Sequence, residues 1–301
     1  MQTRDVGELL LLSVLWGAAY LFMRAAVPAF GPAPLIALRM AIAVAVLLPW
    51  LVWRGGVAQL RAHPVALVVQ AVFFTALPFL LLGFAAQHLT AGLLSVLNAT
   101  APLFAALLSH FAFQERLGRW RSAGLVIGFA GVVVLTAGSV SFRSADGLLA
   151  VAAVLVTSAL WSLGANYTRR RLGGMDNLAL TVGSLAVASV ALVPLAVVTW
   201  PTEAPPLRAW IEMAFLGVGS SGLGFLLYYR LLRRIGTVRA MSVTFLNPVV
   251  ALVAGALYLG EVITWQTLAG AAVVLLGTAL SLGLWPGRPV GVLPSGSTPK
   301  P

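Results

Sequence analysis

Long apolar stretches alternate with short polar connections along the chain. Ten stretches each hold about 20 mostly apolar residues, the length that an α-helix needs to cross the hydrocarbon core of a bilayer. They cover residues 6–26, 33–53, 64–87, 91–113, 119–139, 147–167, 176–200, 209–232, 237–259 and 264–285. This pattern predicts an all-α membrane protein with ten transmembrane helices.

The apolar pattern is duplicated. The stretch 91–131 recurs as 237–277, and four pairs of residues match at the same separation: Pro102 with Pro248, Glu115 with Glu261, Gly124 with Gly270 and Gly131 with Gly277. Each copy has five spans, and an odd number of spans makes the second copy enter the membrane from the opposite side. We therefore expect two inverted five-helix repeats, residues 5–139 and 146–285, around a central cavity. The Pro/Gly/Ser-rich segment 286–301 is expected to be a disordered cytoplasmic tail.

Composition narrows the class of protein. Sixty per cent of the residues are hydrophobic and only 9% are charged, which is typical of an integral membrane protein surrounded by lipid. A net charge of +11 would suggest a nucleic-acid partner for a soluble chain, but here the basic residues lie in the connections between spans. We expect no nucleic-acid partner, no metal and no cofactor. The chain has no cysteine, which excludes disulfides and thiolate chemistry.

The basic residues predict the orientation. A cytoplasmic N-terminus places most of the 19 Lys and Arg residues on the cytoplasmic face, as the positive-inside rule requires. Both termini and the turns 168–175 and 233–239 are then cytoplasmic, while 140–146 and 201–208 face outward. The abundance of arginine, alanine, glycine and valine is typical of a GC-rich bacterium, so we expect a multi-pass protein of the bacterial inner membrane.

Several residues together resemble a known family. They are the Leu-Trp-Gly sequence at 15–17, Arg39 early in the second span, the proline in the fourth span, and Glu115 followed by Gly124. The chain is similar, over about residues 5–285, to the EamA family of the drug/metabolite transporter superfamily, and within it to the YddG-like amino-acid exporters. The resemblance implies a secondary transporter of small molecules that works by alternating access, and neither an enzyme nor a cofactor-dependent protein.

Two of the nine tryptophans stand apart. The other seven lie at span ends, where the interfacial aromatic belt places them, whereas Trp16 and Trp161 lie deep in spans one and six and are repeat partners. A buried indole N–H needs a polar partner. Trp16 and Trp161 therefore either line the substrate cavity or pack between helices.

Matched prolines predict a site near the membrane midplane. Pro102 and Pro248 each remove one backbone hydrogen bond from the middle of a span, and polar side chains lie beside both. These side chains are Ser95, Asn98, Thr244 and Asn247. Interrupted helices at matching places of two repeats indicate a substrate site, with a plain hinge as the alternative reading.

Glycines and a third proline suggest moving or closely packed places. Pro78 in span three is opposite the glycine-rich stretch 217–224 of span eight, which holds Gly222 and Gly224. We interpret this pair as a gate or a close helix contact. Gly124, Gly128 and Gly131 form a small-residue stripe for an internal or a dimeric interface, and the sequence leaves the choice between monomer and homodimer open.

Charged residues in the apolar spans are scarce. Arg39 lies about two turns inside span two, where a cation either lines a polar cavity and binds an anion or extends its side chain to the interface. Glu115 and Glu261 are expected to favour the N-termini of spans five and ten electrostatically.

These features predict an exporter of small metabolites, best matched by neutral or aromatic amino acids, that works by rocking of its two five-helix halves. Alternatives within the superfamily are other small metabolites or drugs. A membrane channel is a rival from another class, although a filter-like loop is absent from the sequence. Residues 219–222 also match the GxSG of intramembrane serine proteases, a pattern of four common residues.

Overall fold

The computed structural model describes residues 3–113, 118–137, 144–235 and 243–282, and every element within them is a helix. Seven predicted spans are single helices: α1 (Thr3–Phe30), α2 (Pro32–Trp53), α7 (Arg119–Ala137), α8 (Ala145–Arg171), α9 (Asn177–Val198), α13 (Val243–Leu259) and α14 (Trp265–Ser281). The other three spans each consist of several helical segments. The third span contains α3 (Pro64–Ala71), η2 (Val72–Ala76) and α4 (Leu77–His88), and the fourth contains α5 (Ala91–Asn98) and α6 (Ala101–Phe113). The eighth span contains α10 (Leu207–Ala214), η4 (Phe215–Leu223) and α11 (Gly224–Ile235). A short 3₁₀-helix, η1 (Gly56–Arg61), lies between α2 and α3.

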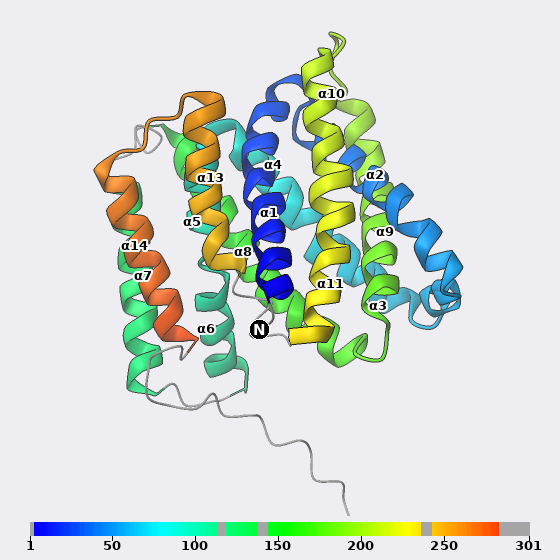
Figure 1. The fold of residues 1–301 in the computed structure, drawn as a ribbon, viewed down its shortest axis with the longest axis horizontal. Coiled ribbons are helices and arrows are strands. Elements are labelled where there is room, and N and C mark those ends of the chain that lie inside the picture. The colour runs from blue at the N-terminus through cyan, green and yellow to red at the C-terminus, as the bar shows by residue number, and fades with distance from the viewer. Residues whose placement is uncertain (1–2, 114–117, 138–143, 236–242, 283–301) are drawn as a thin grey trace, which may run out of the picture.

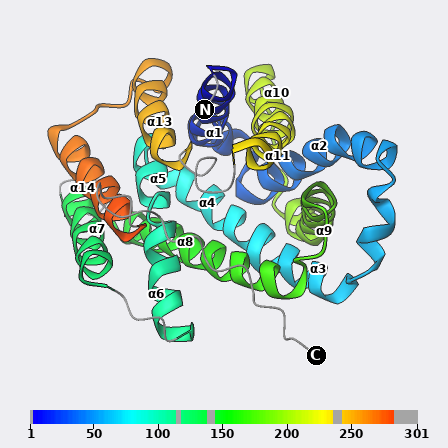
Figure 2. The same cartoon turned by 60° about the horizontal axis from the view of Figure 1, so that its bottom comes forward.

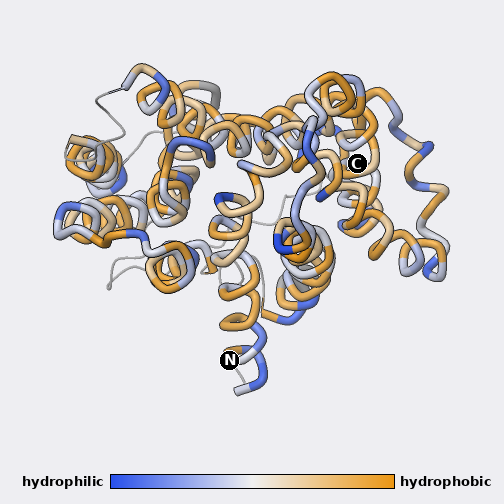
Figure 3. The backbone as a smooth tube through the Cα atoms, turned by 90° about the horizontal axis from the view of Figure 1, so that it is seen from above, coloured by the Kyte–Doolittle hydropathy of each residue, from blue (hydrophilic) through white to orange (hydrophobic). Residues whose placement is uncertain are grey.

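Apolar side chains cover the outside of the bundle as well as its core. In the described residues eight spans are long and apolar enough to cross a membrane, and α13 and α14 are shorter apolar helices of 17 residues each. The backbone tube is hydrophobic over most of its length (Figure 3). Val198 and Leu257 are 83% and 84% exposed, a surface suited to lipid chains. The predicted ten-helix membrane fold is confirmed.

Polar residues begin several helices. Ser144, Asp176 and Thr264 precede α8, α9 and α14, and each side-chain oxygen accepts a hydrogen bond from a backbone N–H two or three residues later. These caps satisfy backbone donors that have no partner within the helix, so they fix where the three spans start.

The two sequence repeats exchange helices. The first helix of the first repeat, α1, packs mainly against α13, α10 and α11 of the second, while its counterpart α8 packs mainly against α4 and α6 of the first. Helices α2 and α9 pair at one edge of the molecule, and α7 and α14 pair at the other (Figures 1 and 2). A five-helix half is therefore not a separate packing unit. The expectation that two such halves rock as bodies stays a prediction, and the packing of α1 and α8 against the opposite repeat counts against it.

The small-residue stripe serves an internal contact. A Cβ atom on Gly124 would lie 2.6 Å from the backbone nitrogen of Ser281, and one on Gly131 would lie 2.6 Å from that of Val274. Neither position has room for a side chain, so α7 and α14 meet backbone to backbone. The stripe thus joins the last helices of the two repeats.

Glu261 corrects an expectation. It follows α13, but its carboxylate accepts hydrogen bonds from the backbone N–H of Ala91, at the start of α5, and not from the start of α14. The start of α14 is instead capped by Thr264. Glu115 lies outside the described residues.

Candidate functional site

Arg39 forms the centre of a buried polar cluster. Its side chain extends from α2 to η4, where Nε donates to the hydroxyl of Ser221 at 2.9 Å and Nη2 donates to that of Ser220 at 3.2 Å. The guanidinium carbon lies 4.8 Å from the centre of the Phe79 ring. Arg39 is only 6% exposed, so it does not extend to the interface. Its Nη1 has no hydrogen-bond acceptor among the described residues.

Two π-helical segments shape this region. Val72–Ala76 and Phe215–Leu223 are π-helices at matching places of the two repeats, and the Gly224 N–H donates to the Gly219 carbonyl at the end of the second. A π-turn is wider than an α-turn and is frequent at functional sites. The wide turn of η4 brings both serine hydroxyls to Arg39 and leaves the Ser220 carbonyl available to a side chain.

The two deep tryptophans lie on either side of this cluster. Trp16 donates from its indole nitrogen to the Ser220 carbonyl at 3.1 Å and packs against Tyr228, with ring centres 5.2 Å apart. Trp161 packs edge to face against Phe79, with ring centres 5.6 Å apart, and the same Phe79 ring contacts the guanidinium of Arg39. The two indoles do not form a ring pair with each other in the described residues. They flank the same site from α1 and α8.

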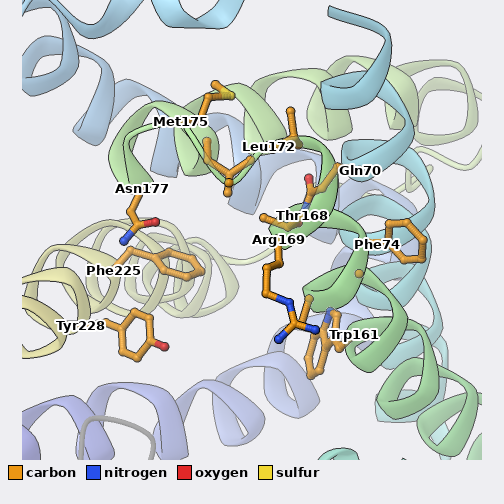
Figure 4. Close-up of a pocket in the computed structure, with 14 residues that line it drawn as sticks. Gln70, Phe74, Trp161, Thr168, Arg169, Leu172, Met175, Asn177, Phe225 and Tyr228 are labelled. Carbon is orange, nitrogen blue, oxygen red and sulfur yellow. The ribbon is translucent and has the colours of Figure 1, made fainter. Parts of the chain in front are cut away.

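A cavity of about 610 Å³ opens beside Trp161. Its wall comes from α3, η2, α8, α9 and α11, at the end of the molecule where α8 ends and α9 begins (Figure 4). The side chains of Phe225 and Tyr228 lie across the space from Arg169, which donates to Asn166 at 2.9 Å. Cavities of about 300–1,000 Å³ hold small-molecule ligands. Trp161 connects this cavity to Phe79 and Arg39.

The predicted asparagines both lie against α1. Asn98 donates from Nδ2 to the Tyr20 hydroxyl at 2.7 Å, and Tyr20 is within electrostatic range of Arg39. The backbone carbonyl oxygen of Asn247 is so close to α1 that a Cβ atom added to Gly17 would lie 2.9 Å from it. Gly17 and Tyr20 are one turn apart on the same face of α1.

Three polar atoms of this region have no hydrogen-bond partner in the part of the chain that the structure describes. The Oδ1 atoms of Asn98 and Asn247 and the Oγ of Ser95 are buried without a hydrogen bond among the described residues. Unpaired buried polar atoms are rare in folded proteins and often mark a place for a ligand or water. Thr244, the fourth polar candidate, is half-buried in the first turn of α13.

The matched prolines differ in what they do. The span containing Pro102 is interrupted, because α5 ends at Asn98 and α6 begins at Ala101. Pro102 is the second residue of α6, where the backbone N–H has no partner within the helix and its loss costs nothing. Pro248 lies inside α13, which continues through it without a break. The expected interruption of the second repeat is therefore absent. A helix tolerates the single lost hydrogen bond when its neighbours pack tightly, as Gly17 does here.

The glycines of η4 and its boundary are closely packed. A Cβ on Gly224 would lie 2.5 Å from the indole nitrogen of Trp16, and one on Gly222 would lie 2.9 Å from Cγ1 of Val46. Pro78, at the second position of α4, is held by a 3.1 Å hydrogen bond from the Thr157 hydroxyl to its carbonyl. These contacts give the glycines and Pro78 a packing role in this conformation.

The family follows from comparison of the whole sequence. The model of the EamA-like transporter family matches twice, at residues 7–137 and 148–283. The chain belongs to this family. Residues 7–137 and 148–283 each cover one set of five spans, so the EamA-like transporter carries the family unit in duplicate.

Its relatives are named as transporters. An uncharacterized transporter of Archaeoglobus fulgidus is 27% identical over 87% of this chain and 92% of its own length. The uncharacterized inner membrane transporter YedA of Escherichia coli is 26% identical over 94% of this chain and 93% of its own. A probable terminal-alkyne amino-acid exporter of Streptantibioticus cattleyicolor is 26% identical over 92% and 93%.

A solved structure shares the fold. A chain titled only as the crystal structure of a protein superposes with a TM-score of 0.68 at 20% identity, over 94% of this EamA-like transporter and 98% of that chain. This similarity supports the fold alone.

The sequence pattern did not indicate the partners of Arg39. Ser220 and Ser221 lie in the glycine-rich stretch 217–224 and in the GxSG pattern, and neither feature points to an arginine. One signal was available: a buried arginine needs acceptors, and two adjacent serines in a glycine-rich span are the polar groups that could supply them. The π-helical turn that aligns them leaves no trace in the sequence.

Proposed function

We propose that this EamA-like transporter exports neutral amino acids across the bacterial inner membrane by alternating access. The observation that carries the proposal is the buried, unpaired Nη1 of Arg39, which is connected to the cavity wall through Phe79 and Trp161. The amide oxygens of Asn98 and Asn247 are also buried without a partner among the described residues. A guanidinium N–H is the usual partner of a carboxylate, and amide oxygens accept from an ammonium group. A zwitterion supplies both.

The surroundings favour an apolar side chain on that zwitterion. Trp161, Phe225 and Tyr228 contribute aromatic faces to the cavity, and the residues that line it include no Asp or Glu to pair with a cationic drug. A phosphate ester would need several basic groups in one place. Among the described residues, Arg169 is the one basic residue that lines this cavity, and Arg39 lies apart from it against Phe79, so the two cations are not gathered in one place and a single carboxylate fits better.

Relatives and charge support the setting. The Streptantibioticus relative is named a probable amino-acid exporter, and the Escherichia relative is named an inner membrane transporter. The positive-inside rule puts both termini in the cytoplasm. With that orientation the cavity opens to the cytoplasm, where a substrate for export is collected.

The rival classes find less support. Ser220 and Ser221 accept hydrogen bonds from Arg39, and a guanidinium has no lone pair with which to take a serine proton. A channel needs a continuous path, whereas the described cavity lies at one end of the molecule.

Counterflow in proteoliposomes tests the proposal. Vesicles preloaded with an unlabelled amino acid should take up the labelled compound transiently above its equilibrium level, which a carrier does and a pore does not. A panel of neutral amino acids should be compared with matched analogues: the amino-acid amide, which lacks the carboxylate, and the 2-hydroxy acid, which lacks the ammonium group. We expect exchange only with the intact zwitterions. Exchange of the amides at the same rate would overturn the role given to Arg39, and absence of counterflow with every amino acid would overturn the substrate class.

A further inference from the structure

The cavity opens at one end of the bundle, and helices pack tightly at the opposite end, called the closed end here. The cavity end contains the turn from α8 to α9 and the start of α1, and the closed end contains the corner between α4 and α5 and the connection after α13 (Figure 1). At that closed end α5 packs tightly on α13. A Cβ on Gly92 would lie 2.9 Å from Cγ of Leu252, and one on Gly255 would lie 3.5 Å from Cβ of Ala91.

Arg24 holds the corner from one side. It lies near the end of α1, and its Nη1 donates to the backbone carbonyls of Ala86 and Gln87, both at 2.9 Å. These carbonyls belong to the last turn of α4, where the helix dipole is negative and carbonyls have no partner within the helix. The cation thus completes the end of α4, a helix that packs mainly against α8.

Glu261 holds the same corner from the other side. Its two carboxylate oxygens accept from the Ala91 N–H at 3.0 and 3.1 Å. Ala91 is the first residue of α5, where the dipole is positive and N–H groups have no partner within the helix. An anion therefore binds the start of α5 directly beside the cation that binds the end of α4.

We propose that Arg24 and Glu261 are the gate residues of the closed end: together they clamp the α4–α5 corner onto α1 and α13, and the transporter opens this end only when both contacts break. Each residue matches the charge of the helix end it binds. The clamp rests on the alternating access proposed above and not on the identity of the substrate.

The clamp is built to be reversible. Burial raises the pKa of the Glu261 carboxyl above its usual value, and the N–H groups of Ala91 and Gly92 and the charge of Arg24 oppose that rise. The carboxylate is thus partly desolvated in the closed state, and it regains water when the end opens. Rehydration then offsets part of the lost hydrogen bonding, which lowers the cost of opening this end.

Thiol labelling can measure which end is open, because the chain has no cysteine of its own. Ser95→Cys places a thiol one turn beyond the clamp at a site that is 2% exposed, and Ala165→Cys places one in the wall of the cavity. The protein should be studied in lipid nanodiscs, where both faces meet a membrane-impermeant maleimide. In the native background we expect rapid labelling at position 165 and slow labelling at position 95.

Loosening the clamp should reverse this ratio. Glu261→Gln or Arg24→Gln removes a charge-assisted contact, so labelling at position 95 should rise about tenfold while labelling at position 165 falls. Glu203→Gln is the control. Glu203 lies at the same end, on the exposed connection between α9 and α10, so loss of its charge should change neither rate.

A charge swap distinguishes the clamp from a simple ion pair. In the double variant Arg24→Glu, Glu261→Arg an attraction between the two side chains would persist, but each charge would then face a helix end of its own sign. We expect position 95 to label at least as fast as in either single variant. Restoration of slow labelling at position 95 by the swap would overturn the proposal. Unchanged labelling rates in folded single variants would overturn it as well. A rise in labelling at both positions would indicate general loosening of the protein and would also overturn it. None of these readouts uses a substrate, so failure here is separate from failure of amino-acid export.

Discussion

At the scale of single residues, the proposed binding of a carboxylate depends on the buried Arg39. Two of its nitrogens are paired, because two serine hydroxyls accept from Nε and Nη2, and Phe79 covers the plane of the guanidinium. One nitrogen, Nη1, is left without an acceptor in the described residues. A buried donor without a partner costs about 1–3 kcal/mol, which a bound carboxylate would recover.

Substitution of Arg39 should weaken binding in steps. Arg39→Gln removes the charge and should lower the apparent affinity for an amino acid roughly 10- to 100-fold, the range expected for a hydrogen bond to a charged group. Arg39→Lys keeps the charge but loses the planar fork that would serve both serines and the substrate. Its affinity should therefore fall between that of the native protein and that of Arg39→Gln. Counterflow measured against substrate concentration gives these values.

The control for this series is Arg54→Gln. Arg54 follows α2 and stacks on Trp50 at 5.3 Å, far along the helix from the cluster, so its loss should leave affinity unchanged. If folded Arg39→Gln protein binds as tightly as the native protein, Arg39 is a structural residue only.

At the scale of elements, glycine allows two helices to touch by their backbones. Helices α7 and α14 are the last spans of the two repeats, and Gly124 and Gly131 of the first face Gly277 and its neighbours on the second. In a membrane, where burial of apolar groups gives little driving force, such close approach supplies the van der Waals contact that holds helices together.

Gly131→Ala should destabilise this pair. The new methyl group would lie 2.6 Å from the backbone nitrogen of Val274, so the helices must separate, at about 1–3 kcal/mol for an overpacked contact. Gly7→Ala is the matched change in α1, where no atom lies within 4 Å of the added carbon and alanine is the better helix former. Thermal unfolding in detergent should show a lower midpoint for the first variant and an equal or higher one for the second. Equal midpoints for Gly131→Ala and the native protein would contradict the backbone contact.

At the scale of the whole molecule, exchange of α1 and α8 replaces two independent halves by two groups of mixed origin. One group contains α1, α10, α11 and α13, and the other contains α4, α6 and α8, while α5 packs against both. The cavity lies between α8 and α11 at one end. At the other end Arg24 joins α1 to the end of α4, and Glu261 joins the end of α13 to the start of α5. This arrangement fits a transporter that is open to one side.

Orientation in the membrane can be measured directly. Thiols introduced by Ser144→Cys and Thr202→Cys should react with an impermeant reagent added to intact cells, because the positive-inside rule places both outside. Gly174→Cys, in the exposed turn between α8 and α9, should react only after lysis. The reverse pattern would invert the topology, and the cavity would then face outward.

The sequence alone determined the number of spans, the duplicated pattern and the class of protein. These properties depend only on the order of residues along the chain: a span needs about 20 apolar residues in a row, and a repeat is a match between two stretches of one chain. The deep tryptophans and the interruption before Pro102 were also visible, because each depends on the residue itself and its nearest neighbours.

The tertiary structure decided which residues meet. Arg39 contacts serines more than 180 positions away, α1 packs with the opposite repeat, and Glu261 binds the start of α5 instead of α14. In each case several partners satisfy the same local chemistry, and only the packing of the helices chooses between them. The π-helical turn of η4 and the unbroken helix at Pro248 have the same origin, since neighbouring helices determine whether a lost backbone hydrogen bond opens a helix or is absorbed by it.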